Sequence, residues 1–409
     1  MDSLKDRRIL LAVTGGIAAY KSCELARLLK KQGATVQVAM TEHATQFVTP
    51  LTFEALTGLP VLLTEWREGG GAMPHIAAGF QSDLILVAPA TANILAKAAC
   101  GIADDLVSTL IAARRAPVAF APAMNTRMWT NPPCQRNVQQ LKEDGALVWG
   151  PASGGLACGE TGAGRMLEPA ELLERTISFF SEKYLDGKKL LITAGPTYEP
   201  IDPVRGLTNR SSGKQGFALA QAAARAGACV TLVAGPCALP TPFGVERIDV
   251  LTAKEMREAV LARVSSFDIF IAVAAVCDWK PTEPLNQKIK KIPGNEPPAF
   301  RLELNPDILS EVGHLPESER PFTVGFAAET QNVEAYAREK LERKNANMIA
   351  GNQANQTLGS DRNTVHLVTQ RGVKTIGPAP KGEISQGLLR EIASHLQNQQ
   401  KAQQPNVRR

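Results

Sequence analysis

Short apolar runs alternate with amphipathic stretches from the first residues of the chain onward. Five runs rich in Val, Ile, Leu and Ala predict buried strands in the first half: RILLAV (8–13), TVQVAM (35–40), DLILVA (83–88), PVAFA (117–121) and ALVWG (146–150). Helical patterns lie between them, most clearly over 16–31 and 105–114. Apolar strands that alternate with helices are typical of a parallel sheet covered on both faces. The first half therefore predicts a doubly wound α/β domain.

The same pattern starts again near residue 188. KKLLITAG (188–195) is similar to the first strand, and AQAAARAGACVTLVAG (220–235) repeats the helix, the Gly-Ala turn and the second strand. Later strands are expected over 267–275, 321–328 and 363–370. We therefore predict two doubly wound parallel-sheet domains, residues 1–187 and a Rossmann-like domain over 188–409, with a frayed polar tail from about 397.

One insertion distinguishes the second half from the first. PTYEPIDPVRGLTNRSS (196–212) separates its first strand from its first helix. Loops at the carboxyl ends of parallel strands are where ligands bind in such sheets. We therefore expect a ligand site at this insertion.

Composition narrows the class of protein. With 409 residues, 44% hydrophobic and 21% charged, the chain is long enough for two cores. Its net charge of +5 is small and its basic residues are scattered along the chain, so anionic small molecules are as plausible ligands as nucleic acid. Seven cysteines without a CxxC pair argue against a disulfide framework or a zinc site and favour a reducing cytoplasm. The first apolar run is too short for a signal peptide, and no apolar run of about 18 residues indicates a membrane span.

Two common nucleotide-binding motifs are missing. Neither half contains GxGxxG, and TNRSSGKQ (208–215) departs from a P-loop at Thr208 and Gln215, which disfavours a P-loop ATPase and a standard NAD enzyme. TGGIAAYK (14–21) puts two glycines and several backbone N–H groups at a helix start, which suits one phosphate. A tight strand-to-helix turn explains the same residues equally well.

Three residues of the first half carry candidate chemistry. His75 follows GGGAMP on an expected loop, where packing has little use for an imidazole, although a lone histidine is more often structural. Asn125 follows the strand PVAFA, and its amide is either a carboxylate ligand or a turn residue. Cys158 lies in GLACGETGAGRM (155–166), whose glycines favour neither a core nor a stable helix, so its thiol is a candidate reagent.

The order and spacing of several motifs resemble known families. TGGIAAYK, PHIA, APATAN, PAMNTRMW and GLACGETGAGRM resemble the flavin-dependent cysteine decarboxylases. TAGPTYEPIDPVRGLTNRSSGKQG, AAVCDWKP, KIKK and VGFAAET resemble phosphopantothenate–cysteine ligases. Together these motifs cover nearly the whole chain. They are similar to the bifunctional family that joins phosphopantothenoylcysteine decarboxylase to this ligase in coenzyme A biosynthesis.

For the first half the resemblance implies a flavodoxin-like fold and bound FMN. In the family, FMN oxidises the substrate thiol to a thioaldehyde, CO₂ leaves to give an enethiol, and the electrons return to form 4′-phosphopantetheine. The family's base matches His75, its carboxylate-binding amide matches Asn125, and the proton donor on its glycine-rich flap matches Cys158. The flavin-contacting positions match Gly15, Gly16, Ile17, Ala18, Thr41, Thr91, Ala92, Asn93 and Ile94.

For the second half the resemblance implies that CTP with Mg²⁺ activates 4′-phosphopantothenate as an acyl-cytidylate, which the cysteine amine then attacks. Lys288 matches the lysine tied to acyl-cytidylate formation, and Asn209 the asparagine tied to its conversion. Lys290 and Lys291 would join Lys288 around the phosphates, although a short lysine run alone is usually a solvated surface. The CTP-contacting positions match Asp278, Lys288, Pro306, Asp307, Ile308, Leu309, Phe326, Lys340 and Lys344.

The resemblance also implies a homo-oligomer, with trimeric decarboxylase domains and dimeric ligase domains combining into a dodecamer, and no nucleic-acid or membrane partner. Two alternatives remain: a flavin-binding regulatory subunit without turnover, and a flavin prenyltransferase of the same fold. His75, Asn125 and Cys158 beside a ligase half disfavour both. The departures from the family pattern are HIAAGFQSD (75–83), Gly206, Gln215 and Cys277.

Overall fold

The computed structural model describes residues 3–65, 81–156, 159–290, 298–353 and 361–403. The chain divides into two compact units, residues 1–180 and 181–409.

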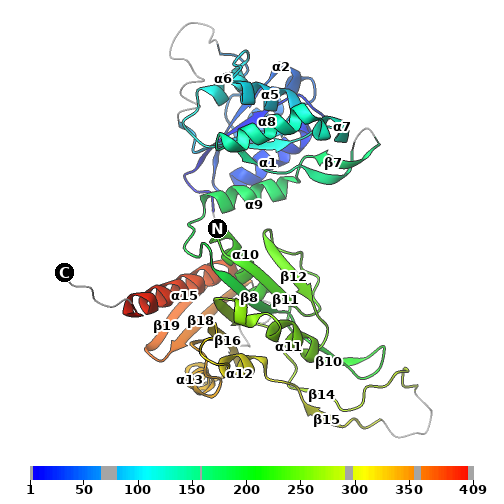
Figure 1. Ribbon diagram of the computed structural model, residues 1–409, viewed down its shortest axis with the longest axis vertical. Coiled ribbons are helices and arrows are strands. Elements are labelled where there is room, and N and C mark those ends of the chain that lie inside the picture. Colours follow the sequence, from blue (N-terminus) through cyan, green and yellow to red (C-terminus); the bar gives the residue numbers. More distant parts are fainter. Residues whose placement is uncertain (1–2, 66–80, 157–158, 291–297, 354–360, 404–409) are drawn as a thin grey trace, which may run out of the picture. The chain divides into compact units, whose positions relative to one another are not determined.

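The first unit, drawn in blue to green in Figure 1, contains a sheet of five parallel strands in the order β2-β1-β3-β4-β5. The strands are β1 (Arg8–Val13), β2 (Thr35–Met40), β3 (Leu84–Ala90), β4 (Val118–Pro122) and β5 (Leu147–Val148), and a separate hairpin comprises β6 (Ala152–Gly155) and β7 (Thr161–Arg165). The helices are α1 (Ala19–Lys31), α2 (Glu42–Thr45), α3 (Pro50–Thr57), α5 (Ala92–Cys100), α6 (Leu106–Ala112), α7 (Thr126–Thr130), α8 (Pro132–Glu143) and α9 (Pro169–Phe180).

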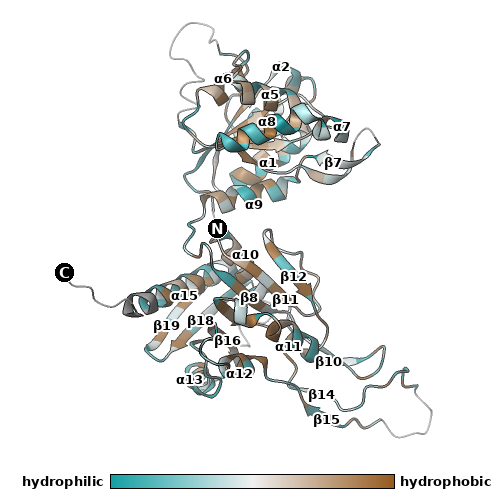
Figure 2. Ribbon diagram, in the orientation of Figure 1, coloured by the Kyte–Doolittle hydropathy of each residue, from teal (hydrophilic) through white to brown (hydrophobic). Residues whose placement is uncertain are grey.

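Side chains of β1 pack on both faces of this sheet. Ile9, Leu11 and Val13 join the buried residues of α1, α3 and α9, whereas Leu10 and Ala12 join those of α5, α6 and α8. Successive strand residues point to opposite faces, so a run of apolar residues needs a helical layer on each side. Hydrophilic residues cover much of α8, whose buried residues are Cys134, Val138 and Leu141 (Figure 2).

The sheet of the second unit has the order β12-β11-β8-β13-β16-β17-β18-β19. Its strands are β8 (Lys189–Ala194), β11 (Cys229–Ala234), β12 (Val245–Asp249), β13 (Ile269–Ala272), β16 (Phe322–Glu329), β17 (Met348–Gln353), β18 (Arg362–Thr369) and β19 (Gly372–Pro380). Two small hairpins pair β9 (Tyr198–Pro200) with β10 (Gly206–Thr208) and β14 (Trp279–Pro281) with β15 (Leu302–Leu304). The helices are α10 (Lys214–Arg225), α11 (Ala253–Leu261), η1 (Val264–Ser266), α12 (Ile308–Gly313), α13 (Val333–Arg343) and α15 (Lys381–Gln403).

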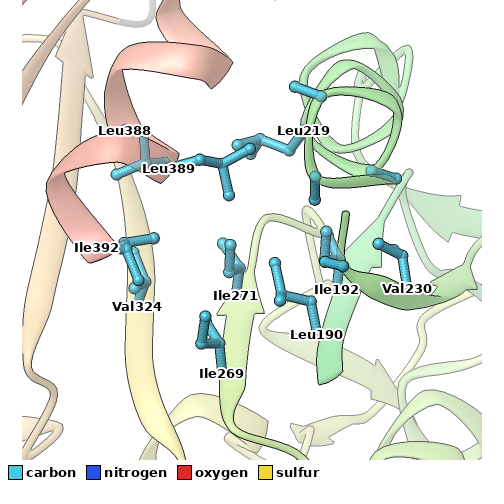
Figure 3. Packing of buried hydrophobic residues seen from close by; sticks show 14 of the residues in the cluster. Leu190, Ile192, Leu219, Val230, Ile269, Ile271, Val324, Leu388, Leu389 and Ile392 are labelled. Carbon is cyan, nitrogen blue, oxygen red and sulfur yellow. The ribbon is translucent and has the colours of Figure 1, made fainter. Parts of the chain in front are cut away.

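Helices cover both faces of this second sheet as well. Leu190 and Ile192 of β8 pack with α10 and with Leu388 and Ile392 of α15 (Figure 3). Leu191, between them, packs with the buried residues of α11, α12 and α13. The predicted α/β class with two doubly wound sheets is therefore confirmed.

The structure differs from the expected elements in several respects. Strands β12, β17 and β19 were not expected from the sequence. β18 pairs antiparallel with both β17 and β19, so the second sheet ends in an antiparallel edge. The inserted segment 196–212 contains the hairpin β9–β10. We expected a frayed tail from about residue 397, but helix α15 continues to Gln403, so the expectation is wrong for residues 397–403. Gln, Lys and Ala favour helix even without an apolar pattern, and here they prolong a helix that already packs on the sheet.

Candidate active sites

A cavity of about 690 Å³ opens at the carboxyl ends of β1, β3 and β4 in the first unit. The strand order reverses between β1 and β3, and open α/β sheets bind ligands at such a switch point. The cavity brings together most of the predicted flavin-contacting residues with Asn125: Gly15, Gly16, Ile17, Ala18, Thr91 and Ala92.

Glycine is required at the first turn of this cavity. A Cβ atom at Gly15 would lie 2.4 Å from the Cβ of His43, so no larger residue fits without moving the chain. At Gly16 the closest atom to such a Cβ would be the Thr91 methyl carbon at 3.8 Å, which is ordinary contact. The loop 14–18 therefore lies close to neighbouring backbone and leaves its N–H groups beside the cavity, an arrangement that suits an anion.

Asn125 begins helix α7. Its Oδ1 accepts a hydrogen bond from the backbone N–H of Met128 at 2.8 Å. This N-cap uses the acceptor of the amide and leaves the NH₂ group as the donor that a carboxylate needs. The side chain thus satisfies both interpretations of the sequence, as a structural cap and as a candidate ligand.

The hairpin β6–β7 packs closely against the loop that carries Asn125. The Met124 N–H donates to the Gly164 carbonyl at 2.9 Å, and a Cβ at Gly164 would lie 2.3 Å from the Met124 oxygen. A Cβ at Gly162 would lie 2.5 Å from Oγ1 of Thr126. The glycines of this segment therefore permit a close approach between hairpin and loop. Cys158, which lies between β6 and β7 in the sequence, and His75 are both outside the described residues.

Three predicted flavin contacts are not among the described residues that line the cavity. Thr41 caps α2, Asn93 is exposed at the start of α5, and Ile94 is buried in the core between sheet and helices. Conversely, the cavity is lined by Tyr20 and Lys21 of α1, which the motif analysis did not single out. Tyr20 and Lys21 follow Gly16 and Ile17 by four residues, which is about one helical turn. This spacing places them on the same side of the helix start and could have identified them.

A buried lysine lies beside this cavity. Lys21 is only 8% exposed, and its Nζ donates to Glu168 at 2.9 Å, while Arg165 forms a second, shorter ion pair with the same carboxylate. The hydrogen bond from Lys21 lowers the pKa of Glu168. The three side chains carry one net positive charge at the cavity rim.

The second unit has a cavity of about 660 Å³ at the carboxyl ends of β13 and β16. It contains all but one of the predicted CTP-contacting residues, namely Asp278, Pro306, Asp307, Ile308, Leu309, Phe326, Lys340 and Lys344. Lys344 forms a close ion pair with Asp307, which also caps α12 by accepting from the Ser310 N–H at 2.9 Å. Burial opposes ionisation of Asp307, but the hydrogen bonds from Lys344 and Ser310 outweigh it and lower its pKa.

Lys340 is one of the residues that line this cavity. Its Nζ donates to the Phe326 carbonyl at 2.7 Å, and burial lowers its pKa despite the attraction of Asp307 and Glu329. Lys340, Lys344 and Asp307 together carry a net positive charge. A polyphosphate is the ligand class that this charge favours.

A further cavity of about 440 Å³ adjoins it. Val273, Ala275, Phe326 and Ala328 line both cavities. Asn209 lines the cavity of about 440 Å³, where its Nδ2 donates to the carbonyls of Ala275 and Val276 at 3.0 and 3.1 Å. Ser211, Ser212 and Gly213 also line it, at the start of α10, which has no side-chain cap. Two ligands bound here would lie next to each other.

Lys288 is not among the described residues that line either cavity. Its side chain and that of Lys290 are exposed, while Ile289 between them is half-buried. Lys291 lies outside the described residues. The described part of the chain contains no cluster of three or more His, Cys, Asp or Glu side chains that could hold a metal ion.

No helix among the described residues is long and apolar enough to cross a membrane.

Comparison with known proteins gives the class of the chain. A family model described as Flavoprotein matches residues 1–181, and one described as DNA/pantothenate metabolism flavoprotein C-terminal domain matches residues 185–396. The cavity at the β1/β3 switch point thus lies in a flavoprotein domain, and the paired cavities lie in the C-terminal domain of a two-domain flavoprotein. This is the class that the fold and the sites define.

Full-length relatives give the family. The coenzyme A biosynthesis bifunctional protein CoaBC of Vibrio cholerae is 51% identical over 402 residues, covering 97% of this chain and 100% of that protein. That of Escherichia coli K12 is 48% identical over 401 residues, covering 96% and 98%. A solved C-terminal domain of a CoaBC protein is 39% identical and covers 53% of this chain and 100% of that one, with a TM-score of 0.46. The chain belongs to the family of coenzyme A biosynthesis bifunctional proteins, as the motifs predicted.

Proposed function

We propose that the chain catalyses two consecutive steps of coenzyme A biosynthesis. The first is the CTP-dependent condensation of 4′-phosphopantothenate with cysteine, and the second is the FMN-dependent decarboxylation of 4′-phosphopantothenoylcysteine to 4′-phosphopantetheine. The observation that carries the proposal is a cavity at the switch point of the first sheet together with two adjoining cavities in the second unit, in a chain that matches these bifunctional relatives over nearly its full length.

The cavity of the first unit fits FMN. The close-packed glycine loop at Gly15 and the N–H groups at the starts of α1 and α5 suit the phosphate, and the apolar residues Ile17, Ala18 and Met124 suit a flat ring. Bound FMN would take two electrons from the substrate thiol and return them after CO₂ has left. Lys21 and Arg165 at the rim would attract the anionic substrate.

The protein's own groups would bind the substrate and move its protons. The Asn125 amide would hold the carboxylate that is lost, His75 would remove the thiol proton, and Cys158 would protonate the enethiol carbon. Glycines at 162 and 164 allow the hairpin to pack over Asn125 and exclude water.

In the second unit, CTP would occupy the cavity with Lys340, Lys344 and Asp307, and 4′-phosphopantothenate the cavity with Asn209. The N–H groups at the start of α10, whose N-cap is a glycine, and the ammonium group of Lys214, which also pairs with Asp361, suit the phosphate of the acid. The shared wall of Val273, Ala275 and Phe326 would bring the carboxylate of the acid to the α-phosphate. Lys288 would then stabilise the phosphates during attack.

Mg²⁺ would enter with the triphosphate. Magnesium commonly keeps several waters and takes one or two protein carboxylates plus phosphate oxygens, so a preformed cluster of acidic residues is not needed. Asp278 is the carboxylate of this cavity that no described cation pairs with. We further propose a homo-oligomer built on decarboxylase trimers, and a cytoplasmic location, which the six free cysteines of the described residues suit.

Incubation of the purified chain with 4′-phosphopantothenate, cysteine, Mg²⁺ and either CTP or ATP tests the proposal. We expect CTP to give 4′-phosphopantetheine, CO₂, CMP and pyrophosphate, followed by mass spectrometry, and a flavin absorbance in the purified protein. Cys158→Ser should stall after decarboxylation. A yellow protein that forms no product with either nucleotide would instead support a regulatory, flavin-binding subunit.

A further inference from the structure

The turn of the β9–β10 hairpin contains a buried carboxylate. Asp202 is 2% exposed, and its Oδ1 accepts from the backbone N–H groups of Val204 and Arg205 at 2.9 and 2.8 Å. Its Oδ2 accepts from Nε and Nη2 of Arg205 at 3.0 and 2.6 Å. These bonds account for the turn itself, but one further partner comes from a distant part of the chain.

That partner is the backbone of Ile289. Its N–H donates to Oδ2 of Asp202 at 3.1 Å, and its carbonyl accepts from Nη2 of Arg205 at 2.7 Å. The Leu285 N–H also donates to the Ile201 carbonyl at 2.9 Å. One ion pair therefore holds both polar backbone groups of Ile289, across more than eighty residues of sequence. We call Asp202 and Arg205 the clamp.

The residues on either side of Ile289 are Lys288 and Lys290. Fixing the N–H and the carbonyl of one residue fixes the peptide planes on both sides of it, and so the starting direction of both lysine side chains. The same hairpin leads at the end of β10 into Asn209, whose amide is bound to Ala275 and Val276 at the cavity wall. The hairpin thus connects the lysine segment to the two cavities.

We propose that Asp202 is a positioning residue of the ligase site: through the clamp it holds the segment 288–290 so that its lysines can reach the nucleotide phosphates. The inference rests on the proposed role of Lys288. An ordinary turn would need only the bonds to Val204 and Arg205; the two bonds to Ile289 serve the lysine segment instead.

The test replaces Asp202 in the full chain. Asp202→Asn removes the charge and one of the two acceptor oxygens, so either the turn donors or Ile289 lose their partner. We expect trypsin to cut the Lys288–Ile289 bond of the folded variant about tenfold faster, since local opening then needs fewer broken hydrogen bonds. Mass spectrometry identifies the new terminus at Ile289. Asp249→Asn, which removes an exposed carboxylate paired with Arg247, is the matched control.

Kinetics decide whether the held segment matters for the reaction. With CTP and 4′-phosphopantothenate but no cysteine, we expect Asp202→Asn to form acyl-cytidylate at least about tenfold more slowly, with most of the change in kcat. Decarboxylation of supplied 4′-phosphopantothenoylcysteine should be unchanged. Arg205→Lys, which keeps the charge but has a single nitrogen for two acceptors, should fall between the variant and the wild type.

Three outcomes would overturn the proposal. Wild-type cleavage at Lys288 would show that the clamp does not hold the segment. Faster cleavage with unchanged acyl-cytidylate formation would show that the lysines need no positioning. Cleavage at many sites in Asp202→Asn together with wild-type kinetics in Arg205→Lys would reduce Asp202 to a folding role. If the wild-type protein itself forms no acyl-cytidylate, the proposed function fails first, and the cleavage result separates the two failures.

Discussion

Thr14 and Thr91 meet where strands β1 and β3 end, and the Thr14 hydroxyl accepts a hydrogen bond from the Thr91 backbone N–H at 3.2 Å. The same hydroxyl donates to the Pro89 carbonyl at 2.7 Å. Thr91 in turn caps α5 by accepting from the Ile94 N–H at 3.4 Å. One buried hydroxyl thus joins the two loops on either side of the switch point, between which the cavity of the first unit opens.

Thr14→Val should destabilise the first unit, because it leaves the Pro89 carbonyl and the Thr91 N–H without this partner. We expect a loss of about 1–3 kcal/mol in the free energy of unfolding. Guanidinium unfolding followed by flavin fluorescence reports on this unit alone. Thr14→Ser keeps the hydroxyl and should stay close to the wild type, whereas a wild-type unfolding curve in Thr14→Val would mean that these hydrogen bonds contribute nothing to stability.

Gly164→Ala should separate the hairpin from the Asn125 loop. The new Cβ would lie 2.3 Å from the Met124 oxygen, at a backbone φ of +139° that side chains rarely adopt. The strain is on the order of 1–3 kcal/mol, so we expect the hairpin to shift and decarboxylation to slow, while acyl-cytidylate formation in the other unit is unchanged. Ser153→Ala, on an exposed position of the same hairpin, should change neither reaction. Decarboxylation at the wild-type rate in Gly164→Ala would mean that the hairpin contact has no part in it.

Asn125→Asp separates the two roles of this side chain. Aspartate caps a helix as well as asparagine does, so α7 and the unfolding curve should stay as they are. The amide donor is replaced by a second oxygen, which repels the substrate carboxylate. We expect kcat/KM for decarboxylation to fall about 10- to 100-fold. A large fall in stability instead would assign Asn125 to the fold.

Local sequence patterns predicted the parallel strands of the first unit and β8, β11, β13 and β16 of the second, because their apolar runs stand out without knowledge of the fold. The parallel strand β17 was missed, and so was β12, which has no buried residue and therefore no apolar run. The antiparallel strands β18 and β19 were not distinguished in this way, since strand direction depends on the connections and not on the run itself. The ion pair of Lys21 with Glu168 joins residues 147 apart and has no local signal.

Two departures from the family pattern have a structural reason. A Cβ at Gly206 would lie 2.4 Å from the Tyr198 ring and 2.6 Å from the Glu199 oxygen, so this hairpin needs glycine there. Gln215 donates to Ser385 of α15 at 3.1 Å and accepts from Asn363 of β18 at 3.4 Å, two contacts that only the folded chain brings together. The motifs named eight residues that gather at the cavity with Lys340 and Lys344, but these supporting contacts depend on tertiary packing.

The buried position of Lys340 predicts how the ligase step depends on pH. Burial lowers the pKa of Lys340, the opposing attraction of Asp307 and Glu329 is smaller, and Lys344 and Arg343 lower it further. An ammonium group attracts the triphosphate and the neutral amine does not. Lys340 is protonated below its lowered pKa and loses its charge as the pH rises through that pKa. The affinity for CTP should therefore fall at a pH below the usual lysine pKa of about 10.4.

The measurement is kcat/KM for pyrophosphate release from CTP and 4′-phosphopantothenate without cysteine, because kcat/KM reports the ionisation of the free enzyme and the cysteine amine then has no influence. Lys340→Arg keeps its charge throughout this range, so its profile should stay flat where that of the wild type falls. Its absolute rate will be lower if the longer side chain disturbs the bond to the Phe326 carbonyl, but the shape of the profile is the decisive readout. The same fall in both profiles would mean that a different group titrates, and Lys340 would then serve only to hold strand β16 in place.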